Sequence, residues 1–366
     1  MWAGVDPFGR AAGAAPPSSR PGGRRSLHPR PPLDGGACAR FTGRRRLPTG
    51  WYPHEVEAEV KSLRVHGPGE PKDVLRVEEV DRPEPGEGQV LVRVRSAAVN
   101  FPDALLCRGT YQIKPDPPFT PGVELCGEVV QAGPGASAPA EGTRVLGTAS
   151  LPDGAFAEYA LMPADAVFPA PDALTDDEAA SLFIGYQTGW FALHRRAALQ
   201  PGETVLVHAA AGGVGSAAVQ LAKAAGARVI GVVGGPDKAR VAAELGADVV
   251  VDRRSQDFVE VVKAETAGRG ADVVFDPVGG DSFARSTKCI AFEGRIVIIG
   301  FASGTIPEQA LNHVLIKNYS LLGLHWGLYQ RRAPELIPQA HDHLTELAGK
   351  GLVKPLVSER VGFDGL

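Results

Sequence analysis

Three glycines, Gly212, Gly213 and Gly215, are spaced as they would be in a turn that binds a pyrophosphate. Glycine allows a sharp backbone turn and has no Cβ to keep a phosphate away. Val214 lies among them at the start of an apolar helical pattern, and the positive end of a helix attracts phosphate. The first position is filled by Ala210, so the pattern is A-x-G-x-x-G and departs once from the full glycine fingerprint.

The elements needed to position this turn follow one another in the right order. An apolar run at 205–207 precedes the turn, and small apolar residues at helical spacing follow it up to residue 225. A second apolar run covers 228–233, and a second helical pattern ends at Gly246. Strand, helix, strand and helix in succession predict a dinucleotide-binding unit, and therefore a nicotinamide cofactor. The alternative is a structural turn in an α/β protein that binds no phosphate.

The end of the second strand indicates which nicotinamide cofactor fits. NAD sites usually carry an acid there for the ribose hydroxyls, whereas this strand ends in Val233 and Gly234. Lys238 follows in the next loop, and Arg253 and Arg254 come directly after a third apolar run. Cations that converge on a 2′-phosphate favour NADPH over NADH. The alternative is that these cations are ordinary solvated charges.

Composition limits the classes of function. The 366 residues are enough for two domains, and the net charge of −4 gives no electrostatic footprint for nucleic acid. The four cysteines lack C-x-x-C spacing and predict neither a disulfide framework nor a structural zinc site. The longest apolar stretch, at 179–193, is too short and too polar to span a bilayer. We therefore expect no nucleic-acid, metal or membrane partner.

Residues 1–55 differ in composition from the rest of the chain. They are rich in arginine, proline, glycine and alanine, contain no lysine and hold few acids. An arginine-rich, acid-poor leader is typical of a mitochondrial transit peptide, so we expect a mitochondrial protein. One alternative is a disordered extension without a targeting function, which fits a cytoplasmic protein. The other is translation of sequence upstream of the true start.

The segment from 60 to about 161 is rich in β-formers. Apolar or alternating runs between glycine and proline clusters predict strands at 60–65, 74–80, 90–99, 127–131, 143–147 and 155–160. These strands predict a compact β-barrel-like domain at 56–178, ahead of an α/β domain at 179–320. Thr175 suits the cap of a helix that begins with the acids at 176–178.

Several separated motifs together identify a family. They are Val-Asn-Phe-Pro-Asp at 99–103 with Gly-Thr-Tyr at 109–111, Pro-Gly-Val-Glu at 121–124, the glycine turn, Asp-Pro-Val-Gly-Gly at 276–280 and Gly-Leu-His-Trp-Gly at 323–327. From residue 61 to 366 the chain resembles the zeta-crystallin-like quinone oxidoreductases of the medium-chain dehydrogenase/reductase superfamily. The resemblance implies an α/β fold, with a GroES-like β-barrel domain followed by a Rossmann domain with a doubly wound parallel sheet. It also implies a substrate cleft between the domains and a homo-oligomer.

The resemblance also bears on zinc and on the end of the chain. Where the family's alcohol dehydrogenase branch has a cysteine and a Gly-His-Glu run, this chain has Phe101 or Pro102 and the run Gly-Val-Glu at 122–124. Two of the three protein ligands of a catalytic zinc are therefore missing, and we expect no metal site. The segment 321–366 is expected to return to the β-domain, and the chain stops before the last helix and strand that the family carries.

Without zinc, nothing lowers the pKa of an alcohol, whereas reduction of an electrophilic acceptor stays feasible. We therefore expect an NADPH-dependent reductase of quinones or α,β-unsaturated carbonyls. By resemblance Asn100, Asp103 and Tyr111 line the cleft, and Tyr111 is the best candidate to donate a proton to the product oxygen. Alternatively Asn100 caps a turn, Asp103 caps a short helix at 104–107, and Tyr111 fills the barrel core.

Five further residues are expected to bind the cofactor. Thr188 matches the family position that contacts the nicotinamide carboxamide, with a helix back-bond as its alternative role. Gly300 and Phe301 follow the strand predicted at 295–299, at the carboxyl ends where open α/β sheets bind ligands. His325 and Trp326 are expected to stack near the nicotinamide, or else to belong to the core.

Two alternative functions stay open. One is an NADPH-binding protein with little turnover, which the family resemblance permits. The other is an enoyl-thioester reductase, which needs a basic patch for the phosphates of its carrier, and no such patch is evident in the cleft segments. The physiological acceptor cannot be read from the sequence, because the cleft depends on loops that no pattern constrains.

Overall fold

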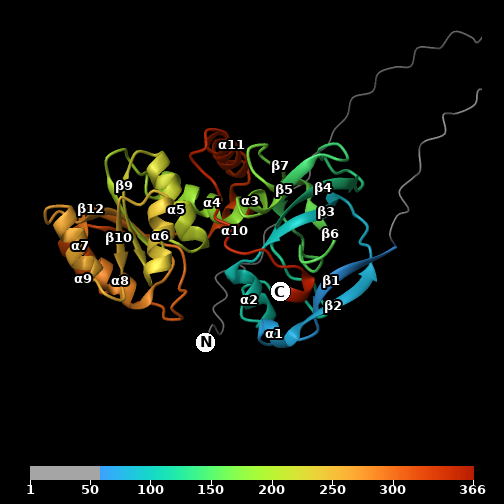
Figure 1. Ribbon diagram of the computed structural model, residues 1–366, viewed down its shortest axis with the longest axis horizontal. Coiled ribbons are helices and arrows are strands. Elements are labelled where there is room, and N and C mark those ends of the chain that lie inside the picture. The colour runs from blue at the N-terminus through green and yellow to red at the C-terminus, as the bar shows by residue number, and fades with distance from the viewer. Residues whose placement is uncertain (1–57) are drawn as a thin grey trace, which may run out of the picture. The chain divides into compact units, whose positions relative to one another are not determined.

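The computed structural model describes residues 58–366, and its larger sheet has six parallel strands (Figure 1). The strands are β8 (Thr204–His208), β9 (Arg228–Val233), β10 (Val249–Asp252), β11 (Ala271–Asp276), β12 (Ile290–Ile298) and β13 (Ser320–Gly323). Their order across the sheet is β10-β9-β8-β11-β12-β13. The strand order therefore reverses between β8 and β11, and ligands bind at such a point in doubly wound sheets.

Helices cover both faces of this sheet. They are α4 (Phe183–Trp190), α5 (Gly213–Ala224), α6 (Pro236–Glu244), α7 (Phe258–Glu265), α8 (Gly280–Ser286) and α11 (Leu336–Gly349). On β8, Val205 and Val207 pack into a core cluster with α4, α5 and α11, whereas Leu206 packs into a second cluster with α7 and α8. Successive side chains of a strand point to opposite faces, which explains why all three central residues of β8 are apolar. The predicted doubly wound sheet is confirmed.

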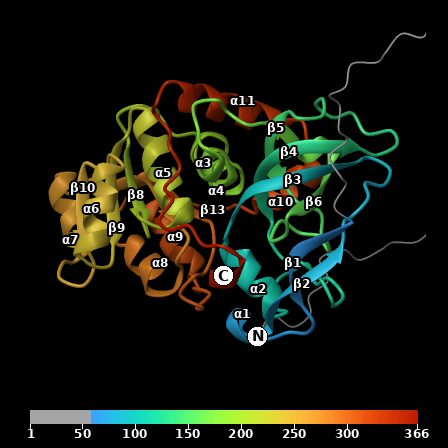
Figure 2. The same ribbon diagram turned by 45° about the vertical axis from the view of Figure 1, so that its right-hand side comes forward.

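A five-stranded antiparallel sheet forms the β-domain (Figure 2). It contains β3 (Gln89–Ala98), β4 (Glu124–Ala132), β5 (Arg144–Thr148), β6 (Tyr159–Pro163) and β7 (Val167–Pro169), in the order β6-β3-β4-β5-β7. A separate hairpin joins β1 (Glu59–Val65) to β2 (Leu75–Asp81), with the short helix α1 (Pro71–Val74) between them. Buried Val90, Val92 and Leu125 are in the core of this domain.

One predicted strand of this domain is wrong in its first half. Residues 155–158 precede β6 as irregular backbone, whereas the sequence pattern predicted a strand at 155–160. The N–H groups of Ala155 and Phe156 donate to the carbonyls of Gly122 and Pro121, at 2.9 Å and 3.0 Å. Because a loop rather than a neighbouring strand satisfies these groups, the segment does not join the sheet.

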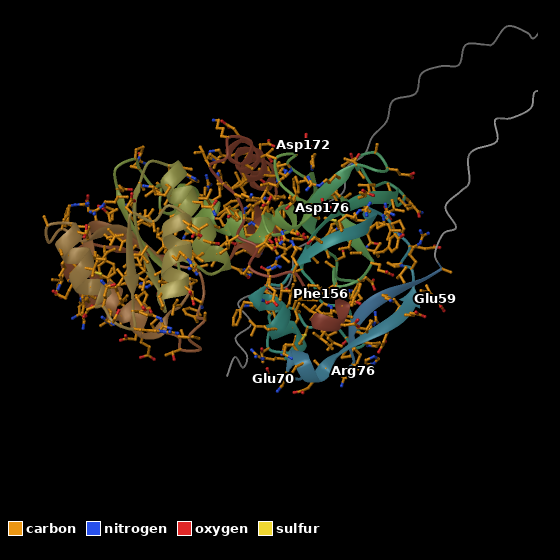
Figure 3. The ribbon with its side chains drawn as sticks, in the orientation of Figure 1. Glu59, Glu70, Arg76, Phe156, Asp172 and Asp176 are labelled. Carbon is orange, nitrogen blue, oxygen red and sulfur yellow. The ribbon has the colours of Figure 1, made fainter. Side chains whose placement is uncertain are left out.

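The chain passes from the β-domain to the α/β domain through α3 (Asp176–Ala180). The helix begins as predicted, since the Thr175 hydroxyl accepts the Glu178 N–H and the Glu178 carboxylate accepts the Thr175 N–H. Asp176, labelled in Figure 3, accepts a hydrogen bond from Arg144 of β5 at 2.6 Å. A π-helical turn at Phe191–Arg196 follows α4.

Three further elements lie after β12: α9 (Leu311–Lys317), α10 (Trp326–Arg332) and the 3-10 turn Phe363–Gly365. In the β-domain, α2 (Phe101–Cys107) precedes β4, and a 3-10 turn, Ala164–Ala166, precedes β7. Within residues 58–366, no helix combines the length and the apolar character that crossing a membrane requires. The predicted leader at 1–55 lies outside the described residues.

Candidate active site

The glycine turn lies between β8 and α5, where the strand order of the sheet reverses. Gly212 is the N-cap of α5, and Gly213 is its first residue. A Cβ on Gly213 would meet nothing within 4 Å, whereas a Cβ on Gly215 would lie 2.1 Å from the carbonyl oxygen of Ala209. Gly215 therefore lets helix and strand approach closely, and Gly213 leaves the helix N-terminus open to a pyrophosphate.

The two other predicted members of the turn, Ala210 and Val214, are packing positions. Ala210 is fully buried, and its N–H donates to the carbonyl of Val232 at 3.1 Å. Its Cβ also lies 3.0 Å from where a Cβ on Gly231 would stand. Val214 packs, partly buried, on the same core cluster. Alanine in the first position therefore packs into the core, and the preceding residue, Ala209, takes a positive φ of 52°.

Two arginines after β10 lie against the glycines that end β9. The guanidinium of Arg253 is 3.2 Å from where a Cβ on Gly234 would stand, and that of Arg254 is 2.8 Å from the same point at Gly235. Gly235 has a φ of +104°, which favours glycine, and it begins α6 as the N-cap. The structure thus brings Arg253 and Arg254 together at the end of β9. Their binding to a 2′-phosphate stays a prediction.

Lys238 and Asp252 complete this corner of the site. Lys238 is exposed in the first turn of α6. Asp252 ends β10, and its carboxylate accepts the N–H groups of Arg254 at 3.0 Å and Gly235 at 2.9 Å, which hold its pKa below the usual value. Sequence reasoning did not assign a role to this acid. It shapes the loop that carries the two arginines.

The loops after β11 and β12 meet at the same edge of the sheet. Asp276 ends β11, and its carboxylate accepts the N–H groups of Val278 at 2.8 Å and Gly279 at 3.0 Å. The ring of Phe301 is 2.8 Å from where a Cβ on Gly279 would stand, so the ring fits only over a glycine. Gly300 and Phe301 therefore lie at the carboxyl ends of the central strands, where sequence reasoning expected cofactor-binding residues.

Thr188, His325 and Trp326 differ in their surroundings. Thr188 is buried in α4, and in the described chain its hydroxyl makes no hydrogen bond to the preceding turn. The Trp326 side chain is 8% exposed; its Nε1 donates to Gln187 Oε1 at 3.1 Å, and its ring meets the Phe183 ring edge-on. These contacts support the core interpretation of Trp326, and its stacking on a nicotinamide stays a prediction. Partial burial and the charge of Arg331 lower the pKa of His325.

Asn100, Asp103 and Glu124 form a buried polar network between α2 (Phe101–Cys107), β4 and α4. The Asp103 carboxylate accepts the N–H groups of Asn100 at 2.7 Å and Gly122 at 3.1 Å. The Asn100 side-chain amide donates to Glu124 Oε1 at 2.9 Å, and Glu124 Oε2 accepts the Ile184 N–H at 2.7 Å. Asp103 therefore fixes the start of α2 from inside the helix, which begins at Phe101 with Asn100 as its N-cap; the alternative that Asp103 caps a helix at 104–107 is wrong. Glu124 joins the β-domain to the first turn of α4.

Glu124 was quoted in a motif but was not predicted as a site residue. It is 2% exposed and Asp103 is 3% exposed. Burial raises the pKa of each carboxyl to about 7, against the opposing effect of the N–H groups that donate to them. The charge of Asp103 also raises the pKa of Glu124. Two carboxyls that gain protons near neutral pH are therefore held beside the candidate catalytic residues.

This network predicts a pH-dependent stability. Because the folded state binds protons at Glu124 more readily than the unfolded state, it contributes stability that is present at low pH and lost as pH rises through about 7. We expect Glu124→Gln to remove this contribution, so the melting temperature of the variant relative to wild type should be lower at about pH 5 than at about pH 8. Melting curves at both pH values measure this, with exposed Glu141→Gln as the control. The same difference at both pH values would contradict it.

Tyr111 lies close to this network in the loop after α2. Its side chain packs, partly buried, against a cluster that contains Val65 and Phe119, in agreement with the core alternative. Burial raises the pKa of its hydroxyl, the charge of Asp103 raises it further, and the charge of Arg331 lowers it. In the part of the chain that the structure describes, the hydroxyl has no hydrogen-bond partner. It is therefore available to a ligand.

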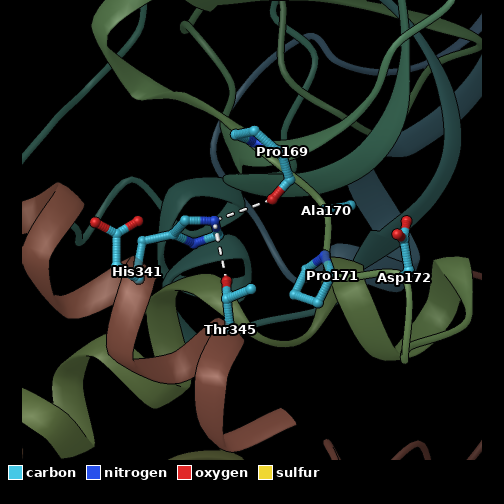
Figure 4. Close-up of a pocket in the computed structure, with 7 residues that line it drawn as sticks. Pro169, Ala170, Pro171, Asp172, His341 and Thr345 are labelled. Carbon is cyan, nitrogen blue, oxygen red and sulfur yellow. Dashed lines mark hydrogen bonds between the residues drawn. The ribbon is translucent and has the colours of Figure 1, made fainter. Parts of the chain in front are cut away.

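The structure also contains a surface cavity of about 390 Å³ that shares no residue with this site. His341 of α11 lines this cavity, and its imidazole Nε2 donates to the Pro169 carbonyl at 3.0 Å (Figure 4). Burial lowers the pKa of His341, so its neutral form is favoured. The contact ties α11 to the end of β7, and we assign the cavity no part in the chemistry.

Metal-ligating side chains do not gather in the described residues: no group of three or more His, Cys, Asp or Glu side chains could hold an ion there. Cys107, Cys126 and Cys289 are each buried and free. Asp103 and Glu124 are occupied by N–H donors, and Val123 stands between Gly122 and Glu124. The donor set at this position therefore does not fit a catalytic zinc.

Comparison with known proteins gives matches across both domains. Residues 86–172 match the alcohol dehydrogenase GroES-like domain, and residues 213–343 match the family described as zinc-binding dehydrogenase. The chain is 42% identical to quinone oxidoreductase-like protein 2 homolog of Nematostella vectensis over 281 residues, which cover 76% of each protein. It is 36% identical to quinone oxidoreductase-like protein 2 of Mus musculus over 313 residues, covering 85% of this chain and 89% of the relative.

A solved structure is similar over the same region. Escherichia coli quinone oxidoreductase complexed with NADPH is 32% identical, with a TM-score of 0.74. The match covers 81% of this chain and 90% of that one. Sequence and structure therefore agree on the same relatives.

Proposed function

The chain is an NADPH-dependent oxidoreductase that belongs to the quinone oxidoreductases of the medium-chain dehydrogenase/reductase superfamily, and from this premise we propose that it reduces quinones or α,β-unsaturated carbonyls without zinc. The observation that carries the proposal is an open glycine turn together with a Tyr111 hydroxyl that has no hydrogen-bond partner within residues 58–366. NADPH, when bound, supplies the hydride. The residues of the chain hold it, orient the acceptor and supply the proton.

The cofactor end of the site is arranged for a phosphorylated dinucleotide. We propose that the N-terminus of α5, with Gly212 and Gly213, holds the pyrophosphate. Arg253, Arg254 and Lys238 surround the end of β9, where a 2′-phosphate would lie. The three cations outnumber the two nearby carboxylates, of which Asp252 accepts backbone N–H groups and Asp237, in the first turn of α6, is paired with Arg240.

Without a metal ion, the acceptor end of the site needs a proton donor to stabilise the charge that develops on the acceptor oxygen. We propose that the Tyr111 hydroxyl donates its proton to the oxygen on which charge develops as the acceptor is reduced. Its raised pKa keeps the hydroxyl protonated through neutral pH. Asn100 and Asp103 hold the start of α2, and with it the loop that carries Tyr111. The lack of ligating atoms at Phe101, Pro102 and Val123 supports a reaction that needs no zinc.

An assay of NADPH oxidation across quinones, enones and enoyl thioesters tests the proposal on the full chain. We expect turnover with a quinone or an enone and no dependence on added zinc or on a chelator. Binding of NADPH without oxidation by any acceptor would leave the alternative of a binding protein. Turnover of enoyl thioesters alone would favour the enoyl reductase.

Cofactor preference gives a separate test at the end of β9. Lys238→Ala and Arg253→Ala are each expected to weaken NADPH binding about tenfold or more, the value of one charge-assisted hydrogen bond. NADH lacks the 2′-phosphate, so its affinity should change little. Titration of both cofactors measures the ratio of the NADPH affinity to the NADH affinity. Arg240→Ala is the control, because it removes an ion pair with Asp237 on the same helix. An unchanged ratio would show that these cations do not bind the 2′-phosphate.

A homo-oligomer is also proposed, through the edge of the larger sheet. β13 is the last strand of that sheet, and the adjacent α9 exposes Leu311, Leu315 and Ile316, each at least 74% accessible. An open strand edge beside exposed apolar side chains suits pairing with a second copy of the chain. Light scattering should give at least a dimer mass for wild type and a monomer mass for Leu315→Arg. A monomeric wild type would refute the proposal.

A further inference from the structure

His208 is the last residue of β8 and lies just before the glycine turn. Its side chain is 1% exposed, and its imidazole Nε2 lies 2.8 Å from the Ser286 hydroxyl of α8. Because that hydroxyl donates its hydrogen to the Ser282 carbonyl at 2.7 Å, it accepts from the imidazole, and Nε2 carries the proton. The Phe258 ring of α7 meets the imidazole edge-on. A buried hydrogen bond therefore ties the end of β8 to α8.

The register of the sheet places Asp276 beside this imidazole. Val207 of β8 pairs with Phe275 of β11. The next residue of each strand is His208 or Asp276, so their side chains share a face of the sheet. Asp276 is 1% exposed, and its carboxylate accepts the N–H groups that open the loop at 277–280. The end of β8, the end of β11 and α8 therefore meet at one buried polar cluster.

Serine, histidine and aspartate are also the residue types of a nucleophilic triad. In a triad the serine hydroxyl donates to the histidine, which then takes its proton. Here the Ser286 hydroxyl is fully buried and gives its hydrogen to the Ser282 carbonyl instead. The cluster therefore has the wrong direction of hydrogen bonding and no exposed nucleophile, and its contacts hold segments of the fold in place.

The loop at 277–280 leads into α8 and supports a further part of the proposed cofactor site. The Pro277 carbonyl accepts the N–H group of Ala302 at 3.0 Å. The ring of Phe301 packs against Gly279, where a Cβ would stand 2.8 Å from it. Phe301, which is expected to bind the cofactor, is therefore positioned through this loop.

We propose that His208 is a positioning residue for NADPH. Its hydrogen bond to Ser286 holds α8, and with it the loop at 277–280 and Phe301, at a fixed place relative to the glycine turn. The inference rests on the proposed cofactor site. The His208 side chain itself faces α7 and α8 rather than the turn. Loss of the bond lets α8 shift and lowers the affinity for NADPH without removing any group that contacts the cofactor.

The test removes each partner of this bond in the full chain. Ser286→Ala leaves the Nε2–H of His208 buried and unpaired, and should weaken NADPH binding about tenfold. At saturating NADPH its kcat should stay close to wild type, because the bound cofactor holds the loop. His208→Leu should weaken binding to a similar extent. The double variant should bind no more weakly than the weaker single variant, because all three lack the same bond. Titration with NADPH, well below the melting temperature of each variant, measures these affinities.

Thr287→Val is the matched control on α8, since it removes a buried hydroxyl that donates to the Ala284 carbonyl at 2.8 Å. It should lower the melting temperature and leave the NADPH affinity unchanged, which separates positioning from stability. His208→Gln keeps a donor near the place of Nε2 and should recover most of the affinity that His208→Leu loses. No recovery in His208→Gln would count against the bond as the cause.

Hydrogen exchange of the wild-type protein needs no variant. Residues 280–286 of α8 should exchange more slowly when NADPH is bound, and unchanged exchange there would overturn the inference. Wild-type NADPH affinity in Ser286→Ala, or additive losses in the double variant, would overturn it as well. Failure of the wild-type protein to bind NADPH would instead overturn the proposed function.

Discussion

Gly215→Ala is expected to weaken NADPH binding by about two orders of magnitude and to lower the melting temperature, because no room exists for the new methyl group. A Cβ there would lie 2.1 Å from the carbonyl oxygen of Ala209 and 3.2 Å from the Cα of Ala210. Both contacts are with backbone, so no side chain can rotate away. The turn or the helix must move, and the proposed phosphate-binding N–H groups move with it.

Gly213→Ala is expected to weaken NADPH binding at the same turn without lowering the stability of the protein. Its Cβ would meet no atom of the protein within 4 Å, so the melting temperature should hold or rise slightly. NADPH affinity should still fall, since the methyl group would occupy the space left for the pyrophosphate. Gly349→Ala, at the end of α11, also has no neighbour within 4 Å and should change neither quantity. Normal NADPH affinity in Gly215→Ala and Gly213→Ala would show that the phosphates bind elsewhere.

Tyr111→Phe is expected to lower kcat about a hundredfold, within the usual contribution of a positioned general acid. The hydroxyl has no hydrogen-bond partner among the described residues, and the phenyl ring keeps its packing against the cluster around Val65 and Phe119. NADPH affinity and the melting temperature should therefore stay close to wild type. Steady-state kinetics, cofactor titration and melting curves together distinguish this result from a folding defect.

The pH profile and a matched variant sharpen that test. Wild-type activity should fall at alkaline pH as the Tyr111 hydroxyl loses its proton, and this fall should be absent from the residual activity of Tyr111→Phe. Tyr159→Phe removes a hydroxyl from the β-domain while keeping the ring that Arg82 contacts, and should leave kcat unchanged. If Tyr111→Phe kept the kcat of wild type, Tyr111 would be a packing residue and water would protonate the reduced acceptor.

Local patterns were sufficient for the cofactor half of the molecule. The apolar run before the glycine turn becomes β8, the run at 228–233 becomes β9 with the same bounds, and Thr175 caps α3 as predicted. Each of these elements depends on residues that are neighbours in the chain. The irregular backbone at 155–158 was missed because the N–H groups of Ala155 and Phe156 bond to a loop more than thirty residues earlier, which no periodicity reveals.

The acceptor half depends on contacts between distant segments. Glu124 matters because its carboxylate accepts hydrogen bonds from the Asn100 side chain and from the N-terminus of α4. The sequence alone determined the fold class and placed a glycine turn between a strand and a helix, because such turns are local; phosphate binding at the turn and a reaction without zinc stay predictions. Only the tertiary structure decided that Asp103 and Glu124 are buried together, because burial and Coulomb interactions depend on distance in space.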